Sequence, residues 1–305
     1  MQTRSGGVGS NFREQGEADY RDYQREHEEQ LLTPGVAFPL IKRLLRLNGE
    51  AEDDKPVEVV LLSRNDPDTG LRVMNSIRQY GLNISRAAFV GGANPIEYME
   101  AFHASLFLSG NTADVEAAVA KGLPAAKVFP TQFVDDEEEQ LRIAFDFDGI
   151  LADDSAEAIF QQERMDAFHA RERDMAHEAL PEGPLGPLLR ELSKLQQWEK
   201  KRMEQEADYV PCIRIAIVTA RNAPAHERVV TTLRKRGIYV DETFFLGGID
   251  KGRILKVFRP HIFFDDQISH IEGVASISPS AHVPYGVTNQ RRPGKNRVDK
   301  ASSAD

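Results

Sequence analysis

The 305-residue sequence predicts an α/β protein with two αβ lobes. Short, mainly apolar runs of strand length, such as Val57–Leu62 and Ile213–Val218, alternate with longer helix-prone stretches, which is typical of parallel sheets with helical crossovers. An internal repeat is the second observation, because residues 59–110 align without a gap on residues 215–266 at a constant offset of 156. Nine aligned positions are identical. We therefore expect the two copies to share one order of strands and helices.

The chain divides into four segments by composition. Residues 1–32 are polar and then charged, so we expect a partly disordered N-terminal segment. Residues 33–139 form the first lobe and end in an acidic run, 135–139, which we interpret as a solvated connector. The second lobe spans 140–290, and the basic, polar residues 291–305 predict a flexible tail.

Within the second lobe, residues 152–212 separate the first strand from the next. They are rich in Ala, Glu, Gln, Arg and Leu and predict two helices, with breaks at Pro181 and at Gly183-Pro184. An insertion at this place predicts a helical cap that closes over a site at the strand end.

The most informative stretch is IAFDFDGILADD, residues 143–154. An apolar run ends in Asp146 and Asp148, and Gly149 follows as the turn residue. Carboxyl ends of strands in open α/β sheets border ligand crevices, and two carboxylates this close repel each other unless a cation or proton lies between them. Taken alone, however, a single DxDG is more often a solvated turn.

Three further segments favour a functional site over a turn. Thr219 ends the run IRIAIVT, Lys251 follows a Gly-Gly turn, and the run HIFF ends in Asp265-Asp266. Each has an ordinary explanation by itself, because strand-end threonines and solvated lysines are common. Their order along the chain, each beside a predicted strand end, is poorly explained by chance.

This order resembles the haloacid dehalogenase-type phosphohydrolases, whose motifs are DxDx(T/V), a strand-end Ser or Thr, a Lys and a strand-end acidic pair. The resemblance implies that Asp146 is the nucleophile and that Asp148 is the general acid and base. Thr219 and Lys251 would hold the phosphoryl oxygens. Mg²⁺ would be bound at Asp146, Asp148 and the acidic pair, with Asp266 as ligand and Asp265 beside it. Ile150 stands where the family commonly has Thr or Val.

The physical requirements agree with these roles. A carboxylate attacks an anionic phosphate only when cations offset the repulsion, and phosphoryl transfer depends on positioning and charge neutralisation. Mg²⁺ prefers hard oxygen ligands such as Asp carboxylates. The single cysteine, Cys212, excludes a thiolate metal cage.

Other stretches resemble the cytosolic 5′-nucleotidase I family. They include TPGVAFPLIKRL, FVGGANPIEYMEAFHASLFLSG, RPHIFFDDQ and AHVPYGV, and the resemblance runs from about Tyr20 to Val287. It implies Mg²⁺-dependent hydrolysis of nucleoside 5′-monophosphates. Family members carry an apolar strand near their start, whereas residues 1–20 contain none, so we expect a truncated or rebuilt amino end.

The first copy of the repeat lacks the residues for this chemistry. Ser63 aligns with Thr219, but Pro95 aligns with Lys251, and Ser109-Gly110 align with the acidic pair. We therefore expect a degenerate, Rossmann-like lobe without catalysis. It either packs against the catalytic lobe or retains a pocket for a nucleotide effector, for which Arg64 and Asn65 are candidates beside the simpler interpretation as a solvated turn.

Composition limits the function classes. The net charge of −10 argues against binding of DNA or RNA, and no apolar stretch is long enough to span a membrane. One cysteine excludes an intramolecular disulfide and predicts a cytoplasmic protein. Alternatives are a phosphatase for another small phosphate ester or a non-enzymatic nucleotide-binding regulator. The sequence leaves the oligomeric state open, a homo-oligomer included.

Overall fold

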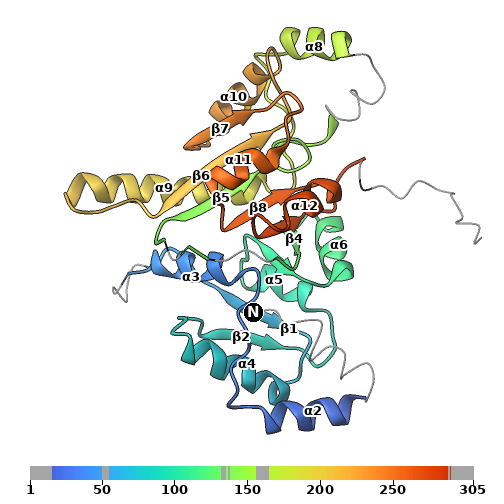
Figure 1. Cartoon of the computed structure of the whole chain (residues 1–305), viewed down its shortest axis with the longest axis vertical. Helices are drawn as coiled ribbons and strands as arrows, with labels where there is room; N and C mark the ends of the chain where they lie inside the picture. Colours follow the sequence, from blue (N-terminus) through green and yellow to red (C-terminus); the bar gives the residue numbers. More distant parts are fainter. Residues whose placement is uncertain are drawn as a thin grey trace, which may run out of the picture.

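A computed structural model describes residues 16–49, 55–131, 135–136, 138–155, 165–287 and 289. The fold is mixed α/β with a parallel-rich sheet (Figure 1), which confirms the predicted class. The N-terminal end and the tail lie outside these residues. The strands are β1 (Val60–Ser63), β2 (Arg86–Phe89), β3 (Phe107–Ser109), β4 (Ala125–Val128), β5 (Leu141–Phe145), β6 (Ile213–Thr219), β7 (Glu242–Phe245), β8 (Ile262–Asp265) and β9 (Ser280–His282).

Helices connect these strands and cover the sheets. They are α2 (Glu17–Glu26), α3 (Phe38–Arg46), α4 (Pro67–Gln79), the 3₁₀ turn η1 (Pro95–Glu97), α5 (Tyr98–Ala101), α6 (Thr112–Ala120), α8 (Met165–Asp174), α9 (Gly186–Gln205), α10 (His226–Lys235), α11 (Lys251–Phe258) and α12 (Ile268–Val274). No helix in the described part of the chain has the length and apolar character to cross a membrane.

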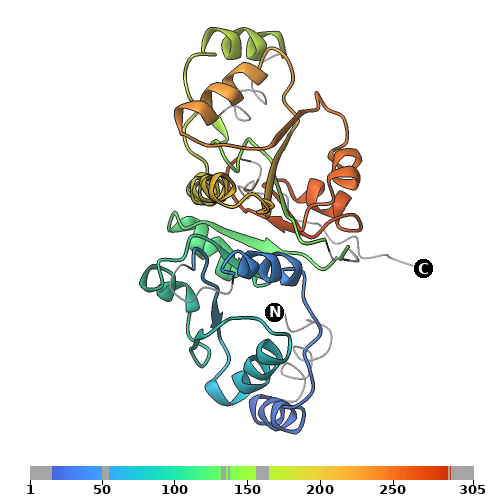
Figure 2. The same ribbon diagram turned by 90° about the vertical axis from the view of Figure 1, so that its left-hand side faces the viewer.

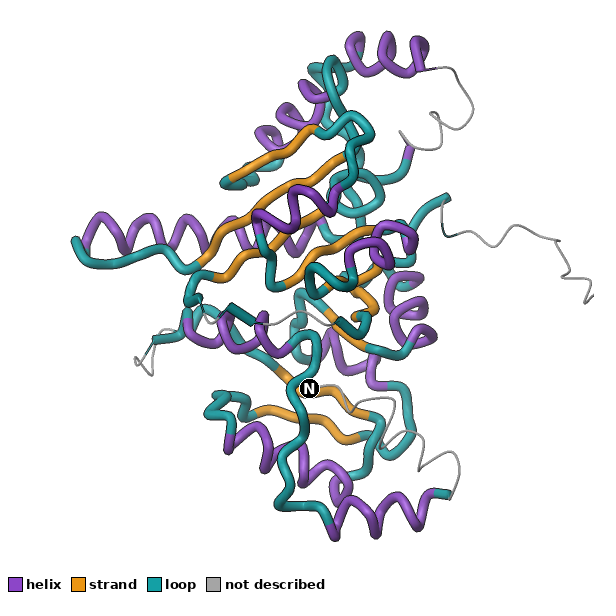
Figure 3. Tube along the Cα trace, viewed as in Figure 1, coloured by secondary structure: helices purple, strands orange, loops and turns teal. Residues whose placement is uncertain are grey.

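The strands form two separate sheets. A seven-stranded sheet has the order β3-β4-β9-β8-β5-β6-β7, and β1 pairs only with β2. Neighbours are parallel except for β4 and β9. Figure 3 shows β1 and β2 as a pair apart from the larger sheet, and Figure 2 shows α3 at the junction between the two parts. Strands β3 and β4 of the first predicted lobe thus join the sheet of the second. The division at residues 139 and 140 remains a prediction.

The two copies of the sequence repeat have the same order of elements. The series β1, α4, β2, η1 with α5, and β3 corresponds to β6, α10, β7, α11 and β8. Even the strand register is repeated, since Val60 pairs with Arg86 and Ala216 pairs with Glu242, each shifted by 156. The order that the repeat predicts is therefore present.

The two copies meet in the larger sheet where β4 pairs with β9. These two strands lie at matching places in the repeat, and they pair antiparallel, with Lys127 opposite His282 and Val128 opposite Ala281. On this basis the order β2-β1 and β3-β4 mirrors β9-β8-β5-β6-β7, but no described strand of the first copy matches β5.

Strand β5 is the centre of the larger sheet. All five of its residues are buried, and Phe145 stacks on Phe264 of β8 with ring centroids 5.1 Å apart. A strand covered on both faces reads as a continuous apolar run, and each large side chain buried in this way contributes about 1.5–3 kcal/mol. This burial holds β5 between β6 and β8.

Helix α9 lies within the predicted cap range 152–212, and its apolar face packs on the sheet. Its residues Leu188, Leu189 and Leu192 are buried in the main core with strands of the sheet. The Glu199 carboxylate accepts backbone N–H groups from Cys212 and Ile213 at the start of β6. Because its apolar face packs on the sheet, α9 is a crossover helix. Helix α8, beside α10 at one end of the molecule (Figure 1), remains as the candidate cap.

The amino ends of β5 and β8 are joined through a buried histidine. The backbone N–H of Arg142 donates to the ring Nδ1 of His261 over 3.0 Å. The backbone N–H of His261 donates to the Arg142 carbonyl over 2.8 Å. Burial, together with the guanidinium groups of Arg43 and Arg142, lowers the pKa of His261 to about 4. The neutral ring thus keeps its acceptor nitrogen and fixes the two strands side by side.

We predict that His261 makes stability fall in acid. Its pKa drops from 6.5 in the unfolded chain to about 4 in the fold, so the unfolded state gains a proton first and stability is lost as pH falls through this window. Denaturant unfolding at pH 7 and pH 4.5 should show that the stability difference between wild type and His261→Asn shrinks by about 2 kcal/mol. The same change at the exposed His177 should leave a constant difference. A constant difference for His261→Asn would contradict the prediction.

Candidate active site

The carboxyl ends of three adjacent strands, β6, β5 and β8, carry the residues singled out in the sequence. Asp146 follows β5 directly and is only 5% exposed. Thr219 ends β6, and Asp265 ends β8, both buried. Parallel neighbours end at the same edge of a sheet, where ligand crevices of this fold class lie. The structure thus places these three residues at one sheet edge.

Lys251 bridges two of the carboxylates. It is the first residue of α11, and its Nζ lies 2.7 Å from Oδ2 of Asp146 and 2.7 Å from Oδ2 of Asp265. Asp250 caps this helix by accepting the Gly252 N–H at 2.9 Å. All three members of the bridge are buried. Breaking such a pair leaves an uncompensated buried charge, at a cost of about 3–5 kcal/mol.

The charges in this bridge are unequally stabilised. Burial raises the pKa of Asp146 to about 7, although Lys251 acts in the opposite direction and Asp265 adds to the rise. Burial also disfavours the charged Asp265, but Lys251 and His270 outweigh it and hold its pKa below the usual value. The two aspartates likewise outweigh burial at Lys251 and raise its pKa. Lys251 therefore stays protonated, and Asp146 is the carboxylate whose charge is least stabilised.

Asp265 is saturated by donors. Besides Lys251, it accepts the Gln267 N–H at 2.8 Å and lies 3.1 Å from Nδ1 of His270. Its oxygen atoms are directed to these groups. Asp265 thus holds Lys251 in place.

Asp148 is held by a guanidinium group that the sequence analysis missed. Nε and Nη2 of Arg221 donate to the two carboxylate oxygens over 2.8 Å and 2.7 Å. Arg221 also pairs with Glu172 of α8, which in turn accepts from Arg228 at 2.8 Å. Arg221 and Glu172 are buried. The fork is the geometry in which arginine binds a carboxylate most specifically, so this network connects α8 to the DxD motif.

Gly149 allows Asp266 to approach the DxD turn. Its φ is +72°, and a Cβ at this position would lie 2.6 Å from Cγ of Asp266. Only glycine adopts such a backbone angle without strain. The Asp266 carboxyl group is therefore packed directly against the turn that carries Asp146 and Asp148.

Thr219 takes part in the turn that follows β6. It is 1% exposed, and its Oγ1 accepts the Arg221 N–H at 3.2 Å. The hydroxyl proton remains for an acceptor at the strand end. In the first copy Ser63 repeats this contact, accepting the Asn65 N–H at 3.1 Å, so the turn itself is common to both copies.

The first copy contains the fold of the site without its charges. Pro95 and Ser109 occupy the positions of Lys251 and Asp265. Arg64, a candidate for effector binding, pairs with Asp114 and donates to the Gly92 carbonyl at 2.9 Å. Its guanidinium group is thus engaged within the lobe.

The donor set of the site fits a hard divalent cation. Four carboxylates, Asp146, Asp148, Asp265 and Asp266, gather at one sheet edge against Lys251 and Arg221. Ligand atoms of Asp146, Asp265 and His270 lie within 4.8 Å of one another, but the Lys251 ammonium bridges the two aspartates. Asp266 lies on the other side of Asp146, against the Gly149 turn that carries Asp146 and Asp148, and carboxylate oxygens of this kind are the ligands that hard divalent cations prefer.

Two residues of the site had no separate signal in the sequence analysis. Glu172 lies in a charged helical stretch in which it resembles its exposed neighbours. Arg221 follows Thr219 by two positions, and comparison with Asn65 of the first copy marks it as a difference between the copies. That comparison could have identified Arg221.

Comparisons with known proteins agree with the motifs. A 5′-nucleotidase family model matches residues 9–290. Human cytosolic 5′-nucleotidase 1B is 35% identical over 278 residues, which cover 88% of this chain and 45% of that protein. The chain thus spans less than half the length of this relative. No solved structure matches the chain. The family match covers most of the sequence and confirms the resemblance found in its motifs: the chain belongs to the 5′-nucleotidase family.

Proposed function

We propose that the chain is a Mg²⁺-dependent phosphoric monoester hydrolase that converts nucleoside 5′-monophosphates to nucleoside and phosphate. The observation that carries the proposal is the Asp146–Lys251–Asp265 bridge at the sheet edge, next to Asp148 and Asp266. The family match supports the 5′-nucleotide as substrate. The name of the human relative supports the same substrate class.

Asp146 acts as the nucleophile. Its Oδ2 contacts Lys251, and its Oδ1 accepts the Phe147 N–H at 2.7 Å, which fixes the carboxylate. Attack on phosphorus forms an aspartyl-phosphate and releases the nucleoside. Lys251 offsets the repulsion between the carboxylate and the phosphoryl oxygens. The Thr219 hydroxyl group donates a hydrogen bond to one of these oxygens.

Asp148 transfers the protons. As the acid it protonates the leaving 5′-oxygen, and as the base it then removes a proton from the water that hydrolyses the aspartyl-phosphate. Both of its oxygens contact Arg221, so one of them leaves the guanidinium group when it reaches the substrate. Arg221 is the positioning residue that limits where Asp148 can go.

Asp146, Asp148 and Asp266 would hold Mg²⁺, and Asp265 supports the site through Lys251. The ion would supply positive charge at the phosphoryl oxygens. The surplus of carboxylates over basic groups supports this assignment, as does the burial that disfavours the charge of Asp146. A divalent cation has a higher charge density than the Lys251 ammonium group, so it would stabilise the ionised form of Asp146 further.

Replacing Asp146 should abolish turnover. Asp146→Asn removes the attacking oxygen, so phosphate release from nucleoside monophosphates should fall about 1,000-fold or more. Circular dichroism and thermal unfolding should show a folded protein. The matched control is Asp114→Asn, a buried aspartate of the first copy that pairs with Arg64, and it should keep near-normal turnover. Near-normal release by Asp146→Asn would reject the nucleophile.

Mg²⁺ should be required. Phosphate release should be lost in excess chelator and restored by Mg²⁺, whereas Ca²⁺, which accepts looser coordination, should restore it poorly. Calorimetric titration should show at least about 10-fold weaker Mg²⁺ binding to Asp266→Asn, which keeps the size of the side chain beside Gly149. Full activity in chelator would reject the metal requirement, and equal affinity would reject Asp266 as a ligand.

The fork between Arg221 and Asp148 should matter for kcat more than for KM. Arg221→Lys keeps a charge but loses the planar pair of donors, so kcat should fall about 10-fold or more while KM changes less. Arg214→Lys makes the same change at the other end of β6 and should have kinetics close to wild type. Unchanged kcat in Arg221→Lys would show that the guanidinium group only packs.

A further inference from the structure

The segment AHVPYGV, residues 281–287, has no role in the chemistry described so far. It begins in β9 and continues past the end of that strand to Asn289. Because β9 pairs parallel with β8, His282 lies opposite Asp265 in the strand register. The segment therefore runs directly beside the strand end that carries Asp265 and Asp266.

Two side chains of this stretch hold one carbonyl group, that of Asp266. Nε2 of the His282 ring lies 2.9 Å from the carbonyl oxygen, and Nδ2 of Asn289 donates to the same oxygen over 2.9 Å. A carbonyl oxygen only accepts, so the His282 ring is the donor in its contact. His282 is 7% exposed and Asp266 is 3% exposed, which leaves little access for competing water. The peptide group that follows Asp266 is thus fixed by two donors.

Fixing this peptide group also fixes the direction of the Asp266 side chain. A rotation of the backbone at Asp266 would break both contacts and would move the carboxyl group away from the DxD turn. On the opposite side, the carboxyl group packs against Gly149, where a Cβ would lie 2.6 Å from its Cγ. The next residue is also held, because the Gln267 N–H donates to Asp265 at 2.8 Å. The turn of residues 265–267 is therefore held on both sides.

The segment itself is anchored at its far end. The Val287 N–H donates to the Asp154 carboxylate, in the stretch that follows the DxD motif. Gly286, with a φ of +77°, permits this approach, because a Cβ there would lie 2.6 Å from Oδ2 of Asp154. The Asn289 amide also donates to the Tyr285 carbonyl at 2.6 Å. These contacts close the turn that presents Asn289 to the site.

The first copy differs at the corresponding positions. Gly110 aligns with Asp266 in the repeat. Lys127 of β4 pairs with β3 at the place where His282 of β9 pairs with β8. The copy that lacks the carboxylate therefore also lacks the histidine that would hold it.

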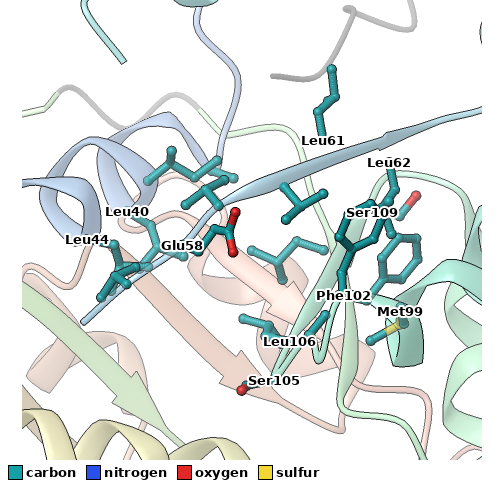
Figure 4. Close-up of a pocket in the computed structure, with 18 of the residues that line it drawn as sticks. Leu40, Leu44, Glu58, Leu61, Leu62, Met99, Phe102, Ser105, Leu106 and Ser109 are labelled. Carbon is teal, nitrogen blue, oxygen red and sulfur yellow. The ribbon is translucent and has the colours of Figure 1, made fainter. Parts of the chain in front are cut away.

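The segment does not border the cleft of the first lobe. That cleft, of about 1890 Å³, is lined by leucines that include Leu40 and Leu44 of α3 and Leu61 and Leu62 of β1 (Figure 4). Among the residues that the structure describes, none between 280 and 289 lines it. The polar contacts of His282 and Asn289 are directed to the candidate active site instead.

We propose that His282 and Asn289 are positioning residues that hold Asp266 in the conformation in which it binds the divalent cation. This inference rests on the proposed function, in which Asp266 is a ligand. The two residues act through the Asp266 carbonyl and are not ligands themselves. Groups that orient a metal ligand typically change metal affinity by about 10–100-fold when they are replaced.

Asn289→Ala removes one of the two donors at a half-buried position. Calorimetric titration should show Mg²⁺ binding about 10-fold weaker than in wild type. Saturating Mg²⁺ should restore kcat, because the ligand is displaced but still present, whereas a loss of folded protein would not be recovered. The matched control is Asn48→Ala, which removes an amide that donates to the Val57 carbonyl at 2.8 Å in the first lobe. It should leave the Mg²⁺ affinity unchanged.

Two replacements of His282 separate the hydrogen bond from packing. His282→Gln keeps a nitrogen donor within reach of the Asp266 carbonyl and should bind Mg²⁺ nearly as tightly as wild type. His282→Leu keeps an apolar side chain of similar size without the donor and should bind Mg²⁺ about 10-fold more weakly. If His282→Leu does not fold, Asn289→Ala decides.

A double-mutant cycle tests whether Asn289 acts through Asp266. In the Asp266→Asn background, Asn289→Ala should cause no further loss of Mg²⁺ affinity, because the ligand that it positions is already gone. Additive losses, or wild-type affinity in Asn289→Ala and His282→Leu while Asp266→Asn is weakened, would overturn the positioning role alone. Wild-type affinity in Asp266→Asn would reject the ligand itself, and the positioning role with it.

Discussion

The contact of Lys251 with Asp146 and Asp265 connects three elements at once. It joins the first residue of α11 to the ends of β5 and β8 over two distances of 2.7 Å. A buried lysine and a buried aspartate cannot remain charged unless each has its partner. The fold therefore requires these residues to stay together, and their contact places a buried carboxylate beside a cation at the sheet edge.

Arg221 connects the DxD motif to helix α8. It contacts Asp148 at the sheet edge and Glu172 on α8, so the position of a helix in the insertion is coupled to a carboxylate of the DxD motif. Any movement of α8 toward or away from the sheet changes the partners of Arg221. The position of α8 is thus coupled to Asp148 through Arg221.

Comparison of the two copies distinguishes the residues that build the strand-end turns from the charged residues of the site. Both copies build the same strand-end turns, with Ser63 and Thr219 in equivalent contacts and with the same strand register. The second copy combines this scaffold with Asp146 after β5, Asp265 at the end of β8 and Lys251 at the start of α11. It is also the copy that contains a central strand.

The sequence by itself determined the α/β class, the repeat and the set of candidate residues, because each is written in local patterns: apolar runs, turn glycines and strand-end polar residues. It could not decide that α9 packs on the sheet, since an amphipathic helix has the same pattern on a sheet as in a cap. Arg221 and Glu172 are 49 positions apart, and only the tertiary fold makes them a buried pair. The contact of His282 with the Asp266 carbonyl likewise depends on which strands pair, and pairing is a long-range property.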